Sequence, residues 1–352
     1  MKIVHVISGA GYGGTWAQFE RVARVLHAAG IGQRVIASAT NMHASRVQAA
    51  GVETIVMELP GSFAFMDRRK INAELKRYTP DIVMSWDPTS SALIEPGGYV
   101  HVGRAPLNYD APRLATCNVL IAPSQARADA AIAAGRLATD IHVLSNLPST
   151  TLPATGVIPF DRKKNFTPAT ARLIFAAARL EESKGIADLF AALAKLSGLY
   201  LWVAGDGAYR TALEDRAYTL GIKPRLRFLG WQDDLRPFLA AADVFVYPAR
   251  QEDLSDTIVE AWAAGAPVVA TDSLGPGLLI KNQENGLLVS VGDVQSLADA
   301  IKFLMVEKEA AKNLASAGSA AYAEAFAPEK LTKRYIDLLQ RLISSPVASP
   351  LA

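Results

Sequence analysis

The stretch QEDLSDTIVEAWAAGAPVVATD, residues 251–272, contains a polar loop, a helix and a buried strand in succession. The preceding segment ADVFVYPAR has the continuous apolar run of a strand covered on both faces, which is typical of a parallel sheet. Ser255 or Asp256 can cap the helix, and Gly265 ends it just before the apolar strand PVVAT. This order of elements predicts an α/β fold in which a loop after a strand forms a ligand site.

Two carboxylates bracket the start of this helix, because Glu252 lies in the loop and Glu260 lies about two turns further along. The first helical turn offers free backbone N–H groups at Ser255, Asp256, Thr257 and Ile258. These groups lie at the positive end of the helix dipole, where phosphate binds readily. An ionised carboxylate instead accepts hydrogen bonds from adjacent hydroxyls, so the two glutamates suit sugar or ribose hydroxyls.

The E-x7-E spacing of Glu252 and Glu260, followed by EAWAAGAPVVATD and by ENGLLV at 284–289, resembles the nucleotide-sugar site of family 4 glycosyltransferases with the GT-B fold. The resemblance implies that Glu260 holds the ribose hydroxyls of the donor and that Glu252 contacts the donor sugar. Where the family has a Gly-containing segment after the first glutamate, this chain has LSD, and Asp256 also suits a helix cap. The alternative interpretation is a solvated loop and helix.

Length and composition are those of a two-domain globular protein. The chain has 352 residues, of which 50% are hydrophobic and 20% are charged. The net charge is only +2, and the basic residues are spread through both halves without stretches in which they alternate with aromatic residues. We therefore expect no nucleic-acid partner. Cys117 is the single cysteine, which excludes an internal disulfide and fits a reducing compartment. The chain opens on the strand KIVHVIS without a signal-peptide pattern, so we expect a cytoplasmic protein that could sit on the inner face of the membrane.

Strand-like runs alternate with helical patterns, which predicts parallel sheets with helices on both faces. The first set of runs is KIVHVIS, QRVIAS, ETIVMEL, DIVMSW, VHVGR and NVLIAPS, and the second is ARLIFAAARL, LYLWVAGDG, RLRFLGW, DVFVYPA and PVVAT. We predict two doubly wound, Rossmann-like domains facing a central cleft, at residues 1–150 and 169–327, with a Pro- and Thr-rich linker at 151–168. The resemblance assigns the acceptor to the first domain and the nucleotide sugar to the second.

Residues 328–352 contain a last helix and a tail. The helix has one apolar face, made of Leu331, Tyr335, Leu338, Leu339 and Leu342. It resembles the final helix of GT-B proteins, which crosses back to the first domain.

The loop after the first strand, SGAGYGGTW, contains the dinucleotide fingerprint G-x-G-x-x-G at Gly9, Gly11 and Gly14. The next strand does not end on the acidic residue that would hold an adenosine ribose, and an NADP site using Arg46 would be strained. We therefore disfavour a nicotinamide enzyme. The resemblance implies instead that Gly13 and Gly14 let the backbone approach the donor diphosphate or the acceptor.

The first strand of the second domain ends in AARLEESKG, where Arg179 and Lys184 lie five residues apart across a turn. In the family that this chain resembles, the matching cations neutralise the leaving diphosphate without a metal. Together with Glu252 they form the predicted catalytic set. A solvated charged turn is the alternative, because Glu181 and Glu182 could pair with both cations.

Other loops offer fewer signals. GDG at 205–207 is predicted to be a structural turn. Gly230 and Trp231 follow a strand at the turn that lies under the nucleobase in the family, and Trp231 could stack there or be a core or rim residue. The histidines show no metal-ligand spacing, so we expect no metal and no cofactor besides the donor; they are His5, His27, His43, His101 and His142.

The acceptor side is predicted from the segment GGYVHVGRAPLNYDAPRL, in which His101 lies inside a strand and Arg104 at its end. VHVGR is similar to a segment of bacterial glycosyltransferases acting on lipopolysaccharide cores, although APLNYD replaces their Gly-Tyr-rich loop. Arg104, Tyr109 and Asp110 are the candidates for acceptor or sugar contact. Loop packing is the alternative for all three.

One helix could meet a membrane. GSFAFMDRRKINAELKRY places Phe63, Phe65 and Met66 beside five basic residues between Arg68 and Arg77. This pattern suits an anionic membrane surface or a lipid-linked acceptor, while a solvated helix face is the default interpretation.

These observations predict a retaining, metal-independent hexosyltransferase. It would move a sugar from a nucleoside diphosphate, with UDP slightly favoured, to a hydroxyl of a cell-envelope glycan or glycolipid. Retention follows from the resemblance alone. Two other classes stay open, a nucleotide-sugar epimerase on the same fold and a non-catalytic sugar-nucleotide binding module, the latter because of Asp256.

Overall fold

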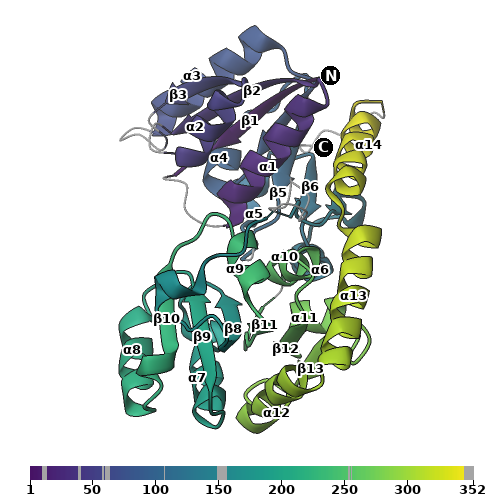
Figure 1. Ribbon diagram of the computed structural model, residues 1–352. Helices are drawn as coiled ribbons and strands as arrows, with labels where there is room; N and C mark the ends of the chain where they lie inside the picture. Colours follow the sequence, from purple (N-terminus) through teal and green to yellow (C-terminus); the bar gives the residue numbers. More distant parts are fainter. Residues whose placement is uncertain are drawn as a thin grey trace. The chain divides into compact units, whose positions relative to one another are not determined.

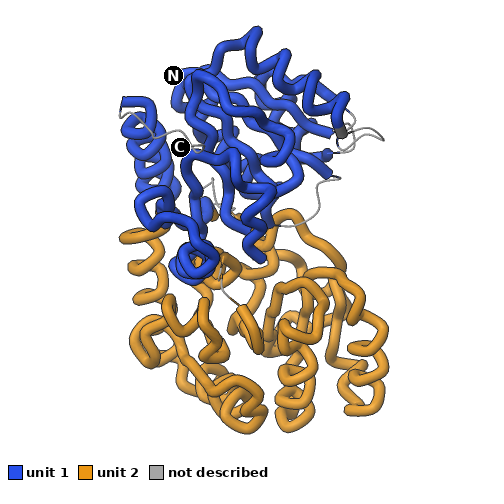
Figure 2. The backbone as a smooth tube through the Cα atoms, turned by 180° about the vertical axis from the view of Figure 1, so that it is seen from behind, with its two compact units in different colours: residues 1–147, 328–352 blue, residues 148–327 orange. Residues whose placement is uncertain are grey.

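The computed structural model describes residues 1–9, 14–38, 41–57, 59, 64–106, 108–148, 157–252, 254 and 256–344. The chain divides into two compact units, Met1–Leu147 with Pro328–Ala352, and Pro148–Ala327 (Figure 2). Each unit is built on one parallel β-sheet flanked by helices (Figure 1). Of the residues predicted to bind the donor, Gly13 and Ser255 lie outside the described residues, as does Phe63 of the segment that could meet a membrane.

The first unit has a seven-stranded sheet in the order β3-β2-β1-β4-β5-β6-β7. Its strands are β1 (Lys2–Ile7), β2 (Gly32–Ser38), β3 (Glu53–Met57), β4 (Ile82–Ser85), β5 (Val100–Arg104), β6 (Val119–Ala122) and β7 (Ile141–Val143). Its helices are α1 (Gly14–Ala28), α2 (Met42–Ala49), α3 (Ala64–Tyr78), α4 (Pro88–Ala92), α5 (Ala111–Leu114), α6 (Gln125–Ala133) and α14 (Pro328–Ser344).

The second unit repeats this plan with a six-stranded sheet in the order β10-β9-β8-β11-β12-β13. Its strands are β8 (Arg172–Ala177), β9 (Leu199–Ala204), β10 (Leu226–Gly230), β11 (Val244–Tyr247), β12 (Val268–Thr271) and β13 (Leu287–Val289). Its helices are α7 (Ile186–Ala194), α8 (Arg210–Thr219), α9 (Arg236–Ala241), α10 (Asp256–Ala263), α11 (Leu274–Leu279), α12 (Val294–Val306) and α13 (Lys308–Ala325). In both sheets the strand order reverses beside the first strand, which confirms the predicted doubly wound fold.

The central strands form where the sequence has continuous apolar runs. All four residues of β4, β6, β11 and β12 are buried, as expected for strands with a helix layer on each face. The edge strands β7 and β13 stand in neither predicted set of runs. Both are three residues long and partly exposed, so they lack the long buried run that marks the others.

The last helix, α14, belongs to the first unit, as predicted. Its buried residues are the five of the predicted apolar face, Leu331, Tyr335, Leu338, Leu339 and Leu342. Gln18 of α1 donates a hydrogen bond from Nε2 to the Tyr335 hydroxyl at 3.2 Å. Within the predicted linker, by contrast, Phe160 stacks on Phe238 of the second unit at 4.8 Å between ring centroids.

Two histidines are buried in the first sheet with both ring nitrogens bonded. His5 receives the Trp86 indole N–H at Nδ1 (3.2 Å), and its Nε2 donates to Gln33 Oε1 (2.8 Å). His101 donates from Nδ1 to the Thr116 carbonyl oxygen (3.1 Å) and accepts from the Ser85 hydroxyl at Nε2 (2.9 Å). Each arrangement needs a neutral ring, and burial lowers the pKa of His5 and of His101 from 6.5 to about 4.

These histidines should make the first unit sensitive to acid. Because the folded pKa lies below the unfolded value of 6.5, their stabilisation is complete above pH 6.5 and is lost as the pH falls towards 4. At pH 5 each of the two histidines should lower the free energy of unfolding by about 2 kcal/mol relative to neutral pH. We expect calorimetry of His5→Gln to show a smaller drop in Tm between pH 7.5 and pH 5 than the wild type shows. An equal drop in the two proteins would contradict the assignment.

Candidate functional site

The carboxyl ends of β8, β11 and β12 bring three loops of the second unit together, because the ends of neighbouring parallel strands lie at one edge of the sheet. The loop after β8 contains Arg179 and Lys184, the latter in the 3-10 turn Glu182–Lys184. The loop after β11 carries Glu252 and leads into α10. This edge is where doubly wound folds bind their ligands.

Lys184 and Glu252 form the centre of this arrangement. The Lys184 Nζ lies 2.5 Å from Glu252 Oε2, and both side chains are nearly buried, at 11% and 12% exposure. Two predicted catalytic residues, 68 positions apart in the chain, are therefore in direct contact. The solvated-turn interpretation is wrong for Lys184, since its partner is Glu252 and not a glutamate of its own turn.

Arg179 behaves differently. Its guanidinium pairs with Glu181 at 2.7 Å, and the two side chains are 56% and 40% exposed. An ion pair this exposed contributes little to stability and breaks at little cost. Arg179 is therefore available to an anion at this edge of the sheet.

Tyr247 is a site residue that the sequence did not single out. It ends β11, and its hydroxyl donates to Glu252 Oε2 at 2.7 Å. Burial, together with the nearby charge of Glu252, raises the pKa of Tyr247 well above its ordinary value. Tyr247 thus stays a protonated donor. In the sequence it stands at the end of an apolar strand and reads as a core residue.

The loop that carries Glu252 is held from the side of α7. Gly185 has φ of +65°, and a Cβ atom added to it would lie 1.8 Å from the Pro248 carbonyl oxygen. The Ser183 carbonyl oxygen accepts the backbone N–H groups of Arg250 (2.8 Å) and Gln251 (3.1 Å). Only glycine allows the two loops to approach this closely, and the approach brings Lys184 to Glu252.

Further bonds to α7, to β12 and to the backbone at Gly275 fix the same loop. The Arg250 guanidinium donates two hydrogen bonds of 2.7 Å to the Asp188 carboxylate on α7. Thr271, at the end of β12, donates its hydroxyl to the Ala249 carbonyl oxygen at 2.5 Å. The Gly275 N–H donates to the Glu252 carbonyl oxygen at 2.7 Å. The backbone at Glu252 is therefore fixed by elements on both sides of it.

The helix α10 begins at Asp256, so Thr257 and Ile258 lie in its first turn, as predicted. Glu260 lies one turn further and is 5% exposed. Arg236 is close enough for the negative charge of Glu260 to act on it. The pKa of Arg236 is raised mainly by its hydrogen bonds to Asp234 and in part by Glu260. Glu260 is thus a buried acidic side chain on the helix that starts beside Glu252.

The predicted nucleobase turn follows β10. Gly230 has φ of +69°, and its carbonyl oxygen accepts the Gly205 N–H at 2.7 Å. Trp231 is 49% exposed, with its indole N–H donating to Asp233, so it is not a core residue. A Cβ atom on Gly205 would lie 1.9 Å from the Ala178 carbonyl oxygen, which confirms the structural role predicted for GDG.

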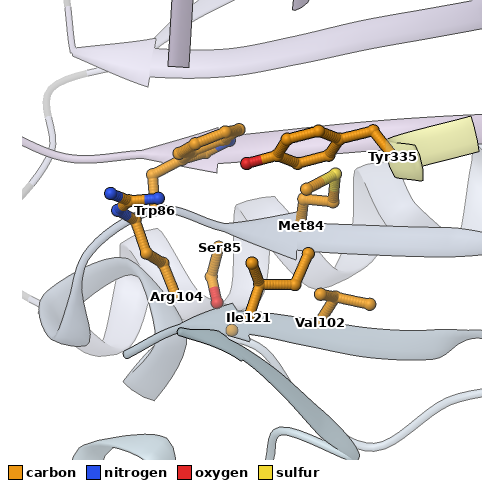
Figure 3. Close-up of a pocket in the computed structure, with 8 residues that line it drawn as sticks. Met84, Ser85, Trp86, Val102, Arg104, Ile121 and Tyr335 are labelled. Atoms are coloured by element: carbon orange, nitrogen blue, oxygen red, sulfur yellow. The ribbon is translucent and has the colours of Figure 1, made fainter. Parts of the chain in front are cut away.

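The predicted acceptor residues lie in the first unit. Arg104 ends β5, is 7% exposed and donates to the Asn146 Oδ1 atom at 2.6 Å. It lines a small cavity with Trp86 and Tyr335, among other side chains (Figure 3). Tyr109 packs beside an apolar cluster, whereas Asp110 caps the helix α5 by accepting the Arg113 N–H. Gly14 starts α1, with open space where a Cβ atom would lie.

Comparisons with known proteins agree on one family. The model of "Glycosyl transferases group 1" matches residues 157–321. The lipopolysaccharide core biosynthesis glycosyltransferase LpsE of Rhizobium meliloti (strain 1021) is 37% identical over 274 residues, covering 77% of this chain and 78% of LpsE. LpsD of the same organism, also named as a lipopolysaccharide core biosynthesis glycosyltransferase, is 29% identical over 346 residues, covering 97% of this chain and 98% of LpsD.

Among solved structures, Anabaena HepE in complex with UDP and glucose superposes with a TM-score of 0.83 and 20% identity, covering 97% of this chain and 100% of HepE. The two doubly wound units and this likeness define the GT-B fold. The chain belongs to the group 1 glycosyltransferases, and it resembles enzymes of lipopolysaccharide core biosynthesis.

The contact between Gly185 and Pro248 can be tested with a matched pair of variants. Gly185 and Gly198 both have left-handed backbones, with φ of +65° and +71°, but a Cβ atom on Gly198 meets nothing within 4 Å. Gly198→Ala should therefore cost only the left-handed penalty of about 1–2 kcal/mol. Gly185→Ala should cost clearly more, because the Pro248 carbonyl must move. Urea unfolding measures both, and equal costs would contradict the contact.

Proposed function

We propose that this glycosyltransferase is a retaining, metal-independent enzyme that transfers a hexose from a nucleoside diphosphate to a hydroxyl of a cell-envelope glycan or glycolipid. The observation that carries the proposal is the nearly buried pair of Lys184 and Glu252 at the carboxyl edge of the second sheet, beside the start of α10. A carboxylate that accepts sugar hydroxyls and a cation that neutralises phosphate are thus held together at one place.

Each residue has a role in this proposal. Glu252 accepts from hydroxyls of the donor sugar, and Glu260 from those of the ribose. Arg179, Lys184 and the N–H groups at the start of α10 stabilise the charge that develops on the leaving diphosphate, which is usually the largest catalytic contribution. With these positive groups present, the reaction does not need a metal ion to neutralise that charge. The acceptor hydroxyl attacks on the face that the diphosphate leaves, so no protein nucleophile is required.

The substrate classes rest on the relatives. HepE has been solved with UDP-glucose, and this supports a UDP-sugar as the donor. LpsE and LpsD are named for lipopolysaccharide core biosynthesis, which supports an acceptor of that kind. Arg104, Tyr109 and Asp110 are the residues proposed to contact it.

A thermal-shift screen against UDP-, GDP- and ADP-sugars tests the donor class. A donor at 100 times its Kd should add about 2.7 kcal/mol to the stability of the native state. Incubation with that donor alone then separates the possible functions. Conversion of the sugar without an acceptor would indicate an epimerase, and binding without transfer or hydrolysis would indicate a binding module.

Removal of the Lys184 cation should slow the chemical step. Lys184→Ala is expected to lower kcat for sugar transfer about 10²- to 10³-fold, the typical cost of removing one group that stabilises transition-state charge. Transfer of radiolabelled sugar to a truncated lipopolysaccharide core measures this loss. Lys302→Ala, which removes an exposed lysine on α12, is the control and should retain full activity. Near-normal turnover of Lys184→Ala would reject the proposed role.

We also propose that α3 contacts the membrane surface. At its start Phe65 and Met66 are 74% and 50% exposed, and the exposed Arg69 and Lys70 follow one turn later on the same side. Apolar side chains next to cations favour an anionic lipid surface. Arg68 at this end pairs with Glu95 at 3.1 Å. In the described part of the chain, every helix is too short or too polar to cross a bilayer.

Charge reversal at Arg68, Arg69 and Lys70 should abolish binding to vesicles that contain anionic lipid, because each cation near such a surface contributes about 1 kcal/mol. Co-sedimentation with vesicles of phosphatidylglycerol and phosphatidylethanolamine measures the effect. Vesicles of phosphatidylcholine alone are the control. Unchanged co-sedimentation of the variant would reject the membrane contact.

A further inference from the structure

Tyr247 is a polar group inside an apolar layer. The side chain is 6% exposed and belongs to the cluster between the second sheet and α10, where its ring stacks on Phe245 at 6.3 Å between centroids. A buried tyrosine hydroxyl needs a hydrogen-bond partner, since leaving it unpaired would destabilise the fold. The partner is the Glu252 carboxylate, which rises from the loop five residues later.

The two oxygens of Glu252 are in different situations. Oε2 receives two donors, the Lys184 ammonium at 2.5 Å and the Tyr247 hydroxyl at 2.7 Å. Oε1 receives the Leu254 backbone N–H at the longer distance of 3.3 Å. A carboxylate oxygen accepts about two hydrogen bonds, so the donors among the described residues saturate Oε2 and leave Oε1 with capacity for another donor.

Two donors on one oxygen also orient the carboxylate. With Lys184 as its only partner, the Glu252 carboxylate could still rotate, because an ammonium group can donate its hydrogen bonds in many directions. The tyrosine hydroxyl is fixed by its packed ring, and the backbone at Glu252 is fixed by the Gly275 N–H. The carboxylate and the backbone of Glu252 are therefore both held in place before any ligand binds.

We propose that Tyr247 is a positioning residue that acts through Glu252. Together with Lys184 it binds Oε2 and so presents Oε1 to a hydroxyl of the donor sugar. This inference rests on the proposed function, in which Glu252 contacts that sugar. It assigns Tyr247 to recognition of the sugar and not of the nucleotide, since the group that accepts the hydrogen bond of its hydroxyl is the Glu252 carboxylate.

The variant Tyr247→Phe removes the hydroxyl and keeps the ring. UDP-glucose, GDP-mannose and ADP-glucose are titrated against the wild type and the variant, alongside UDP, GDP and ADP. The variant should bind the preferred nucleotide sugar about tenfold more weakly, the usual effect of losing one hydrogen bond to a charged group. Its affinity for the free nucleotide should be unchanged, which also shows that the variant is folded. A loss shared equally by sugar and nucleotide, or no loss, would overturn the proposal.

A double-mutant cycle separates positioning from packing. In a Glu252→Ala background, Tyr247→Phe should have no further effect on sugar affinity, because the residue through which it acts is absent. Additive losses would overturn the proposal. Tyr200→Phe, which removes a hydroxyl from β9 near the amino end of the same sheet, is the control and should bind like the wild type.

The same titrations distinguish the two levels of inference. A wild type that binds none of the three nucleotide sugars would reject the proposed function, and the role of Tyr247 with it. A wild type that binds one of them, with a Tyr247→Phe variant that binds it equally well, would reject only the role of Tyr247.

Discussion

The carbonyl oxygen of Pro248 occupies the space that a side chain on residue 185 would need. This constraint places the loop after β8 directly against the loop after β11, with backbone hydrogen bonds to Ser183 completing the contact. The consequence is chemical, because the approach puts Lys184 within 2.5 Å of Glu252. One glycine thus joins two loops that are far apart in the sequence into a single charged centre.

Much of the fold follows from local patterns. Continuous apolar runs marked the central strands, whose two helix layers exclude water from both faces. The apolar face of α14 was predicted residue by residue, since a long amphipathic helix has a strong 3.6-residue period. The short edge strands β7 and β13 were not among the predicted runs. Pairing with a single neighbour creates them, and three partly exposed residues carry little pattern.

The candidate site was predictable to a lesser degree. The spacing of Glu252 and Glu260 indicated their places on the loop and on α10, and the structure shows both there. From the sequence, Lys184 could bind phosphate or pair with a glutamate of its own turn. In the structure its partner is Glu252, which lies in another loop. Tyr247 was missed because a tyrosine ending an apolar strand resembles any core residue. Its role depends on the direction of one hydroxyl, which only tertiary structure sets.

The first unit is discontinuous, because α14 joins residues 1–147 only after the chain has run through the whole of the second unit. On the ribosome, the second unit is therefore complete and free to fold while the first still lacks the helix that covers α1. The apolar surface of α1 stays uncovered until α14 has been synthesised. Synthesis of the first unit thus begins before that of the second unit but is completed after it.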